Sequence, residues 1–327
     1  MNGWIILDKP LELGSTQAVA AVKRALRDGG YPKVKIGHGG TLDPLATGVL
    51  PIALGEATKL AGRMLDASKI YDFTICFGAQ TDTLDGEGVV IATSDHRPSM
   101  AEVEAVLARF TGPIEQVPPI YSALKVDGQR AYDLARAGRE VEMKTRAVVI
   151  HGLSICYSPA SYRHPREGGD PSLESMTRNS GQEMDSRLRG NDETKDVTLT
   201  AHVSKGTYIR SLARDIALAL GTVGHVSMLR RTKAGPFTLA QAISLDKLGE
   251  CGKGRTLEDI ILPLEAGLDD IPALCLTPGQ ARLIHQGQVL DGITADDGLH
   301  CARLENVPVA LVEVSDGNVR VVRGFNL

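Results

Sequence analysis

The sequence predicts an α+β fold built on a largely antiparallel mixed sheet flanked by helices, and three observations favour it. Apolar and polar residues alternate from Tyr71 to Phe77, which is the period of a half-buried strand. Two more alternating segments, 149–157 and 197–203, are expected to pair as neighbouring strands. Helical patterns lie among these strands without the regular strand–helix–strand alternation of a parallel sheet.

The N-terminal part begins with a short apolar strand and an amphipathic helix. Residues 4–7 predict the strand. Ser15 or Thr16 predicts the N-cap of a helix that ends at Gly29-Gly30 and buries an apolar face formed by Val19, Val22 and Leu26. Residues 37–51 predict a glycine-rich loop and turn.

Capping patterns mark the later helices. Ser99 and Glu102 form a capping box before one helix, and Gly221 ends another that covers about 208–220. Thr238–Gln241 is a second capping box, followed by a connection through about 250–268.

A small β-rich domain is expected at the C-terminal end. Thr277 caps a short helix that ends at Gly287, and strands at 309–314 and 319–323 are joined by a turn at Asp316-Gly317. We therefore divide the chain into a large domain, 1–250, and a linker with the small domain, 251–327.

The segment 158–195 interrupts the predicted strand pair. It is rich in Arg, Gly, Asp, Ser and Pro and has no apolar period, so it cannot bury enough apolar surface to offset the entropy of ordering. Long surface insertions cost a fold little. We interpret the segment as a disordered insert in a hairpin connection; an RNA-binding arm is the alternative.

Composition and charge limit the class of protein. No apolar run of about 18 residues is present, so no membrane span is expected, and the N-terminus lacks a secretory signal. The five cysteines are widely spaced, without zinc spacing or a disulfide framework, which fits a reducing cytoplasm. Net charge is −4, but the first 233 residues carry 29 Lys and Arg against 27 Asp and Glu, while residues 234–327 carry 7 against 13. A local basic surface in the first part is compatible with binding nucleic acid.

The most informative segment is His38-Gly39-Gly40-Thr41-Leu42-Asp43-Pro44-Leu45-Ala46-Thr47-Gly48. Taken locally, Asp43-Pro44 is typical of a helix N-cap followed by proline. The glycines at 37, 39 and 40 lack the spacing of a nucleotide-binding loop. Local signals therefore leave the function of this segment open.

The whole string resembles the signature of the tRNA pseudouridine-55 synthase family, and four further blocks of that family follow in the same order. Together they cover roughly residues 3–157 and 196–240, and more loosely the C-terminal part. The blocks begin at Leu54-Gly55-Glu56-Ala57-Thr58-Lys59, at Tyr71 with Thr81-Asp82-Thr83-Leu84-Asp85-Gly86, at Pro118-Pro119-Ile120-Tyr121-Ser122, and at Ser204-Lys205-Gly206-Thr207-Tyr208-Ile209-Arg210.

The resemblance implies roles for several residues. Asp43 would be the catalytic residue, acting either as a base at the ribose or as a nucleophile. Tyr71 would stack on a uracil extruded from the RNA, and Arg210 would pair with Asp43. His38 would lie near the flipped nucleotide, and Tyr208 and Leu229 would form apolar walls of the uracil pocket.

Contacts to RNA are implied elsewhere. Residues 118–146 correspond to an RNA-gripping insertion of the family, and Lys125 and Arg130 within it are assigned to phosphate contact together with Lys205. The C-terminal segment resembles the PUA module of the family, although its acidic composition is unusual for a surface that binds phosphates.

The resemblance thus implies an isomerase that converts one T-loop uridine of tRNA, at position 55, to pseudouridine. No metal or other cofactor is required by this reaction, and we expect a cytoplasmic monomer whose partner is the T-arm of tRNA, with no obligatory protein partner.

Three alternatives remain from the sequence. A guide-RNA-dependent rRNA pseudouridine synthase shares the motif around Asp43. An RNA-binding or chaperone protein without catalysis would not need Asp43, Tyr71 and Arg210 together. A metabolic enzyme with a phosphate-binding glycine loop is the third.

Overall fold

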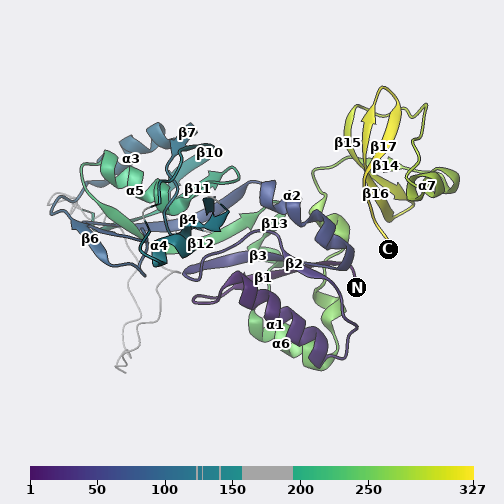
Figure 1. Cartoon of the computed structure of the whole chain (residues 1–327), viewed down its shortest axis with the longest axis horizontal. Helices are drawn as coiled ribbons and strands as arrows, with labels where there is room; N and C mark the ends of the chain where they lie inside the picture. Colours follow the sequence, from purple (N-terminus) through teal and green to yellow (C-terminus); the bar gives the residue numbers. More distant parts are fainter. Residues whose placement is uncertain (123, 127, 140, 157–193) are drawn as a thin grey trace, which may run out of the picture.

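The computed structural model describes residues 1–122, 124–126, 128–139, 141–156 and 194–327 (Figure 1). Almost all of the predicted insert, 158–195, lies outside these ranges, so its expected disorder is not tested.

A nine-stranded mixed sheet forms the centre of the molecule. Its strands pair antiparallel, except that β12 runs parallel to β3, so the predicted fold class is confirmed. Two short strands extend it, β2 (Ile36–His38) beside β3 and β13 (Phe237–Thr238) beside β12. The remaining strands lie in the order β1 (Gly3–Lys9), β3 (Ala46–Leu54), β12 (Gly224–Ala234), β4 (Lys69–Phe77), β11 (Asp196–Val203), β10 (Arg146–Ile155) and β7 (Gly112–Gln116).

The strand β12 was not predicted, although it lies between β3 and β4. Its pairing with β4 shifts register between Val226 and Met228 and again between Arg231 and Lys233. Each shift reverses which face the following side chains occupy, so no simple alternation is visible in the sequence.

The glycine-rich segment predicted as a loop over 37–51 is partly strand. His38 belongs to β2, and β3 already begins at Ala46. The run from Val49 to Leu54 is buried at every position, as in a strand covered on both faces. The loop is therefore shorter than predicted and covers residues 39–45.

Helices cover one face of the sheet in two groups. The helices α1 (Ser15–Asp28) and α6 (Leu245–Gly254) lie over β1 and β3, and α3 (Met100–Leu107) and α5 (Ile209–Ala219) lie over β4, β11 and β10 (Figure 1). Tyr71 and Leu229 pack against both hydrophobic clusters, so the two groups of helices meet over these two residues.

The start of α1 differs from the prediction by one residue. Gly14 is the N-cap, and Ser15 is the first helical residue. The Ser15 side chain is buried and bonds to Leu42 instead of capping the helix. A tertiary contact has therefore replaced the local capping function.

The opposite face of β1 and β3 is covered by η1 (Gly55–Leu60), α2 (Ala61–Asp66) and η5 (Leu264–Gly267). Trp4 and Phe237 lie in this cluster together with Cys301, Leu311 and Phe325 from the C-terminal sheet. The C-terminal sheet thus shares a hydrophobic core with the large sheet.

The C-terminal part contains that four-stranded sheet and one helix. The predicted strands, their turn and the helix cap at Thr277 are confirmed. The elements are β14 (Ala273–Cys275), α7 (Pro278–His285), β15 (Gly298–Leu304), β16 (Val307–Ser315) and β17 (Asn318–Gly324), drawn in yellow tones in Figure 1.

The predicted division at residue 250 falls inside α6. This helix packs on α1, where Gly252 approaches Ala25 so closely that a Cβ at Gly252 would lie 2.9 Å from the Ala25 carbonyl oxygen. The division into 1–250 and 251–327 stays a prediction.

Smaller elements complete the described chain. Thr238 and Gln241 form the predicted capping box at η3 (Leu239–Gln241). The others are β5 (Ala79–Thr81), β6 (Val90–Thr93), η2 (Ala108–Phe110), β8 (Lys125–Val126), β9 (Gln129–Arg130), α4 (Ala131–Arg136) and η4 (Leu257–Ile260).

The predicted strand pair that carries the insert is confirmed as β10 and β11. At the far end of this pair the Cys156 amide donates to the Thr198 carbonyl, and the Phe77 amide donates to the Lys195 carbonyl, both at 2.9 Å. The other end of β11, at Val203, lies at the cavity described next. No helix within the described ranges is long and apolar enough to cross a membrane.

Candidate active site

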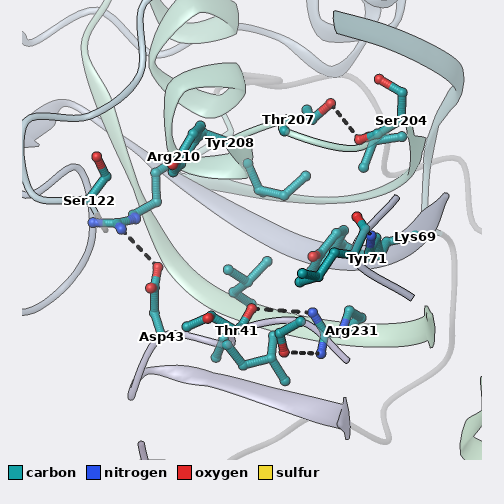
Figure 2. A pocket seen from close by; sticks show the side chains of 18 of the residues that line it. Thr41, Asp43, Lys69, Tyr71, Ser122, Ser204, Thr207, Tyr208, Arg210 and Arg231 are labelled. Atoms are coloured by element: carbon teal, nitrogen blue, oxygen red, sulfur yellow. Dashed lines mark hydrogen bonds and ion pairs between the residues drawn. The ribbon is translucent and has the colours of Figure 1, made fainter. Parts of the chain in front are cut away.

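A cavity of about 340 Å³ opens where the two groups of helices meet (Figure 2). Five of the residues predicted from the sequence line it, namely Asp43, Tyr71, Tyr208, Arg210 and Leu229. The volume is at the lower end of the range for ligand sites, roughly 300–1,000 Å³. Residues far apart in the chain therefore converge on a space suited to a small group such as one nucleotide.

Asp43 lies in the loop between β2 and β3, and several buried side chains fix the backbone of this loop. The Ser15 hydroxyl accepts a hydrogen bond from the Leu42 amide at 2.8 Å and donates to the Leu42 carbonyl at 3.0 Å. Lys9, fully buried, donates to the Pro44 carbonyl at 3.2 Å. Burial lowers the pKa of Lys9 to about 8, while the nearby charge of Asp43 opposes that shift.

Arg231 holds the other end of the same loop from β12. Its guanidinium donates to the carbonyls of Gly40, Thr41 and Val49 at 3.2, 3.3 and 2.8 Å, and the side chain is almost fully buried. Gly48 has φ +99°, and a Cβ there would lie 2.2 Å from the Arg231 carbonyl oxygen. Only glycine allows this approach of the two backbones.

Arg210 and Asp43 form the predicted ion pair. The Nη2 of Arg210, in the first turn of α5, donates to Oδ2 of Asp43 at 2.8 Å. The Arg210 side chain is 8% exposed and that of Asp43 is 45% exposed, so the carboxylate faces the open cavity while its partner lies beneath. This charge-assisted hydrogen bond orients the carboxylate.

Arg210 is itself held by three other groups. Its Nη1 donates to Oδ2 of Asp85 at 3.1 Å and to the Thr83 carbonyl at 2.9 Å, and its Nη2 also donates to the Tyr121 carbonyl at 3.1 Å. The guanidinium therefore has little freedom to move, and the position of the Asp43 carboxylate is set by a rigid donor.

Tyr71, Leu229 and Tyr208 supply the flat and apolar surfaces of the cavity. Tyr71 lies on β4 opposite Arg231, and Leu229 lies on β12 opposite Ala46. Tyr208 is the N-cap residue of α5, and burial raises the pKa of its phenol. An aromatic face and apolar walls around a carboxylate are suited to a planar base.

Four other residues predicted from the sequence do not line this cavity as the structure describes it. His38 does not line the cavity; its Nδ1 is buried without a hydrogen-bond partner in the described structure, and burial followed by the charge of Arg231 lowers its pKa. Lys205 is exposed and pairs with Asp66 at 2.9 Å, beside the cavity residues Ser204 and Gly206. Lys125 and Arg130 lie on the paired strands β8 and β9, and their side chains fall outside the described part. The roles predicted for all four stay predictions.

Sequence reasoning missed Asp85, Lys69 and the role of Arg231. Asp85 belongs to one of the blocks on which the family resemblance rests, but no role was derived for it. No role was derived for Arg231, because the strand that buries it was not predicted. Within the described ranges, no group of three or more His, Cys, Asp or Glu side chains forms a metal site.

Comparisons with known proteins identify the family of this chain. A model of the N-terminal domain of TruB family pseudouridylate synthases matches residues 27–209, and a model of the tRNA pseudouridylate synthase B C-terminal domain matches residues 210–269. The second match ends before the four-stranded C-terminal sheet begins at Ala273.

Relatives and solved structures extend the similarity over the whole chain. Proteins named tRNA pseudouridine synthase B from Novosphingobium aromaticivorans and Zymomonas mobilis are 62% and 54% identical over 327 residues, covering 100% of this chain and 98% and 96% of theirs. A structure of an H/ACA RNP bound to a substrate RNA containing 2′-deoxyuridine has a TM-score of 0.68 at 23% identity, and a Cbf5-Nop10-Gar1 complex has 0.67 at 25% identity. Each covers 99% of this chain and 85% of the matched chain, which supports a common fold.

Fold, site and relatives together define a pseudouridine synthase, an enzyme of the isomerase class. The chain belongs to the TruB family of these synthases. The family and enzyme class predicted from the sequence are therefore confirmed.

Proposed function

We propose that this enzyme isomerises the uridine at position 55, in the T-loop of tRNA, to pseudouridine, with Asp43 as the catalytic residue. The observation that carries the proposal is the Asp43 carboxylate at the cavity, held at 2.8 Å by the buried guanidinium of Arg210. The names of the relatives support tRNA as the substrate.

The reaction conserves every atom of the nucleotide. The bond from C1′ to N1 of uracil breaks and a bond from C1′ to C5 forms, while a proton leaves C5 and N1 gains one. Because a base within a folded RNA is out of reach, the uridine must first be extruded at a cost of a few kcal/mol. Stacking on Tyr71, worth about 1–3 kcal/mol, offsets this cost.

The ion pair with Arg210 holds the Asp43 carboxylate directed into the cavity. A carboxylate in that position can remove a proton from the ribose or attack C1′, and the geometry serves either route. The walls formed by Tyr208 and Leu229 exclude water beside the base.

The proposal extends to how the RNA is held. Residues 118–146, with β8, β9 and α4, are proposed to grip the RNA, with Lys125, Arg130 and Lys205 on phosphates. The C-terminal part is proposed to act as a PUA-like module, and the enzyme to act as a cytoplasmic monomer without a protein partner. Replacing Lys125 and Arg130 by Gln should raise KM with little change in kcat, and light scattering of the free enzyme should give a monomer mass.

Pseudouridine mapping on unmodified tRNA tests the function. We expect product at one T-loop uridine when wild-type enzyme is incubated with the tRNA alone, and none with Asp43→Asn. Asp28→Asn, an exposed carboxylate at the end of α1, is the matched control and should retain full activity. Folded wild-type enzyme that binds tRNA but forms no product on it would contradict the proposal and favour a guide-dependent or binding-only role.

A further inference from the structure

Lys69 and Arg231 form a cationic end of the cavity, separate from the Asp43–Arg210 pair (Figure 2). Both side chains line the cavity, and their residues are only 7% and 1% exposed. The nucleotide chemistry at Asp43 and Arg210 does not use either of them.

Within the part of the chain that the structure describes, the hydrogen bonds donated by these two cations all go to backbone carbonyls. The Nζ of Lys69 donates to Leu65 and Ala67, both at 2.6 Å, which leaves one of its three N–H groups unused. Arg231 uses three of its five N–H groups on Gly40, Thr41 and Val49. Among the residues that the structure describes, neither has a carboxylate within ion-pair distance, whereas Arg210 has two.

The charge of Lys69 is only weakly balanced by its surroundings. Burial, followed by repulsion from Arg231, lowers the pKa of Lys69 to about 8. Asp66 is the nearby carboxylate that opposes this shift, but it is exposed and already paired with Lys205. The charge of Arg231 also lowers the pKa values of Lys9 and His38. Two buried cations without an anion are costly unless a ligand supplies one.

The position of Lys69 relative to Tyr71 indicates what that ligand is. The two residues are separated by one position on β4, so their side chains lie on the same face, roughly 6–7 Å apart along the strand. A nucleotide whose base stacks on Tyr71 would therefore have its sugar–phosphate near Lys69. Uracil is neutral and could not balance two cations, whereas each phosphodiester of RNA carries one negative charge.

We propose that Lys69, with Arg231 behind it, is a phosphate-binding site for the phosphodiester that flanks the extruded nucleotide. The site would fix the sugar–phosphate while Tyr71 holds the base and Asp43 faces the ribose. This inference rests on the proposed function, since it assumes that a nucleotide enters the cavity.

Binding of chemically altered RNA tests the site. The probe is a T-arm stem-loop in which one phosphodiester at a time is replaced by an uncharged methylphosphonate, with 2′-deoxyribose on its 5′ side to keep the linkage stable. Parent hairpins with the same deoxy substitution are the reference. Affinities are measured with Asp43→Asn enzyme so that no turnover occurs. We expect a methylphosphonate on one side of the target uridine to weaken binding about tenfold.

The phosphate site is tested by asking whether the methylphosphonate and a substitution of Lys69 affect RNA affinity independently or through the same contact. In the Asp43→Asn background, Lys69→Gln should weaken binding of the parent RNA by about the same factor, and the methylphosphonate at the sensitive linkage should then cause no further loss. Lys69→Arg should restore sensitivity to the methylphosphonate. Independent, multiplying losses for Lys69→Gln and the methylphosphonate would overturn the proposal, as would the absence of any sensitive linkage.

Lys59→Gln is the matched control. Like Lys69, Lys59 donates to a backbone carbonyl, that of Gly324 at 2.8 Å, but it lies outside the cavity. Any loss of affinity caused by Lys59→Gln should multiply with the loss of affinity caused by the methylphosphonate. If Lys69→Gln does not fold, as judged by thermal melting, Lys69→Met, which also removes the charge, provides the coupling measurement.

Turnover of unmodified tRNA by wild-type enzyme is measured alongside. Turnover without coupling would contradict the phosphate site and leave the function intact. Coupling without turnover would support the site and contradict the proposed reaction.

Discussion

Nη2 of Arg210 donates to Oδ2 of Asp43 across 2.8 Å, although the two residues are 167 positions apart in the chain. The same guanidinium bonds to Asp85 at 3.1 Å, so one buried arginine joins the loop before β3 to the turn after β5. The orientation of the Asp43 carboxylate therefore depends on contacts made at the start of α5.

Replacement of Arg210 should damage catalysis more than binding. Arg210→Met removes the charge that orients Asp43, and we expect kcat to fall by about 10²–10³, as for loss of one preorganised electrostatic contact. Arg210→Lys should recover only part of this loss, because an ammonium cannot bond to Asp43, Asp85 and two carbonyls in the same planar geometry. Single-turnover kinetics on tRNA measures both variants.

Arg214→Met provides the comparison for that measurement. Arg214 lies one turn further along α5 and bonds to its neighbour Asp215 and to the Val117 carbonyl. Its kcat should stay within about threefold of wild type, since neither Asp215 nor Val117 lines the cavity. Equal losses in the Arg214 and Arg210 variants would show that general damage to α5, and not the ion pair, causes the effect.

Gly48 should not tolerate a side chain. Gly48→Ala would place a methyl group 2.2 Å from the Arg231 carbonyl oxygen at φ +99°. We expect the free energy of unfolding to fall by about 1–3 kcal/mol or more, as for a strained backbone position. Urea unfolding checks this. Gly62→Ala, in α2 where an added Cβ would meet nothing within 4 Å apart from the backbone of its own helix, is the control and should raise stability by about 0.5–1 kcal/mol.

Replacing residues 158–193 by a short glycine-serine linker should leave turnover and stability close to wild type. The flanking backbone is already paired, through Cys156 to Thr198 and Lys195 to Phe77, at the end of β11 opposite the cavity. Closing a shorter loop also costs less entropy. Activity and melting temperature of the shortened enzyme test this; a tenfold rise in KM would instead favour the RNA-binding arm.

Lys9 should make stability depend on pH in the alkaline range. Its pKa is lowered from 10.5 to about 8 in the folded enzyme, so between these values the unfolded chain binds more protons. The contribution of Lys9 to the free energy of unfolding should therefore rise as pH increases from about 8 to 10.5. Urea unfolding of wild type and Lys9→Met across this window measures it. A difference between the two proteins that is constant with pH would contradict the burial of a charged Lys9.

The sequence by itself determined the strands with regular alternation, the capped helices and the family. Tyr71–Phe77 and the pair β10–β11 follow from a period of two residues, and the caps at Ser99 and Thr277 follow from local hydrogen bonds. Asp43 and Arg210 were found because whole motifs, unlike single residues, are rarely shared by chance.

Only the tertiary structure decided how these pieces form the site. The strand β12 has two register shifts that hide its period, so the sequence indicated neither its central place nor the burial of Arg231. Ser15 looked like a cap, but it bonds to Leu42 because the loop before Asp43 packs against α1. Local patterns record which residues can form a helix or strand; contacts between distant segments, such as Arg231 with Gly40, depend on how the sheet brings the chain together.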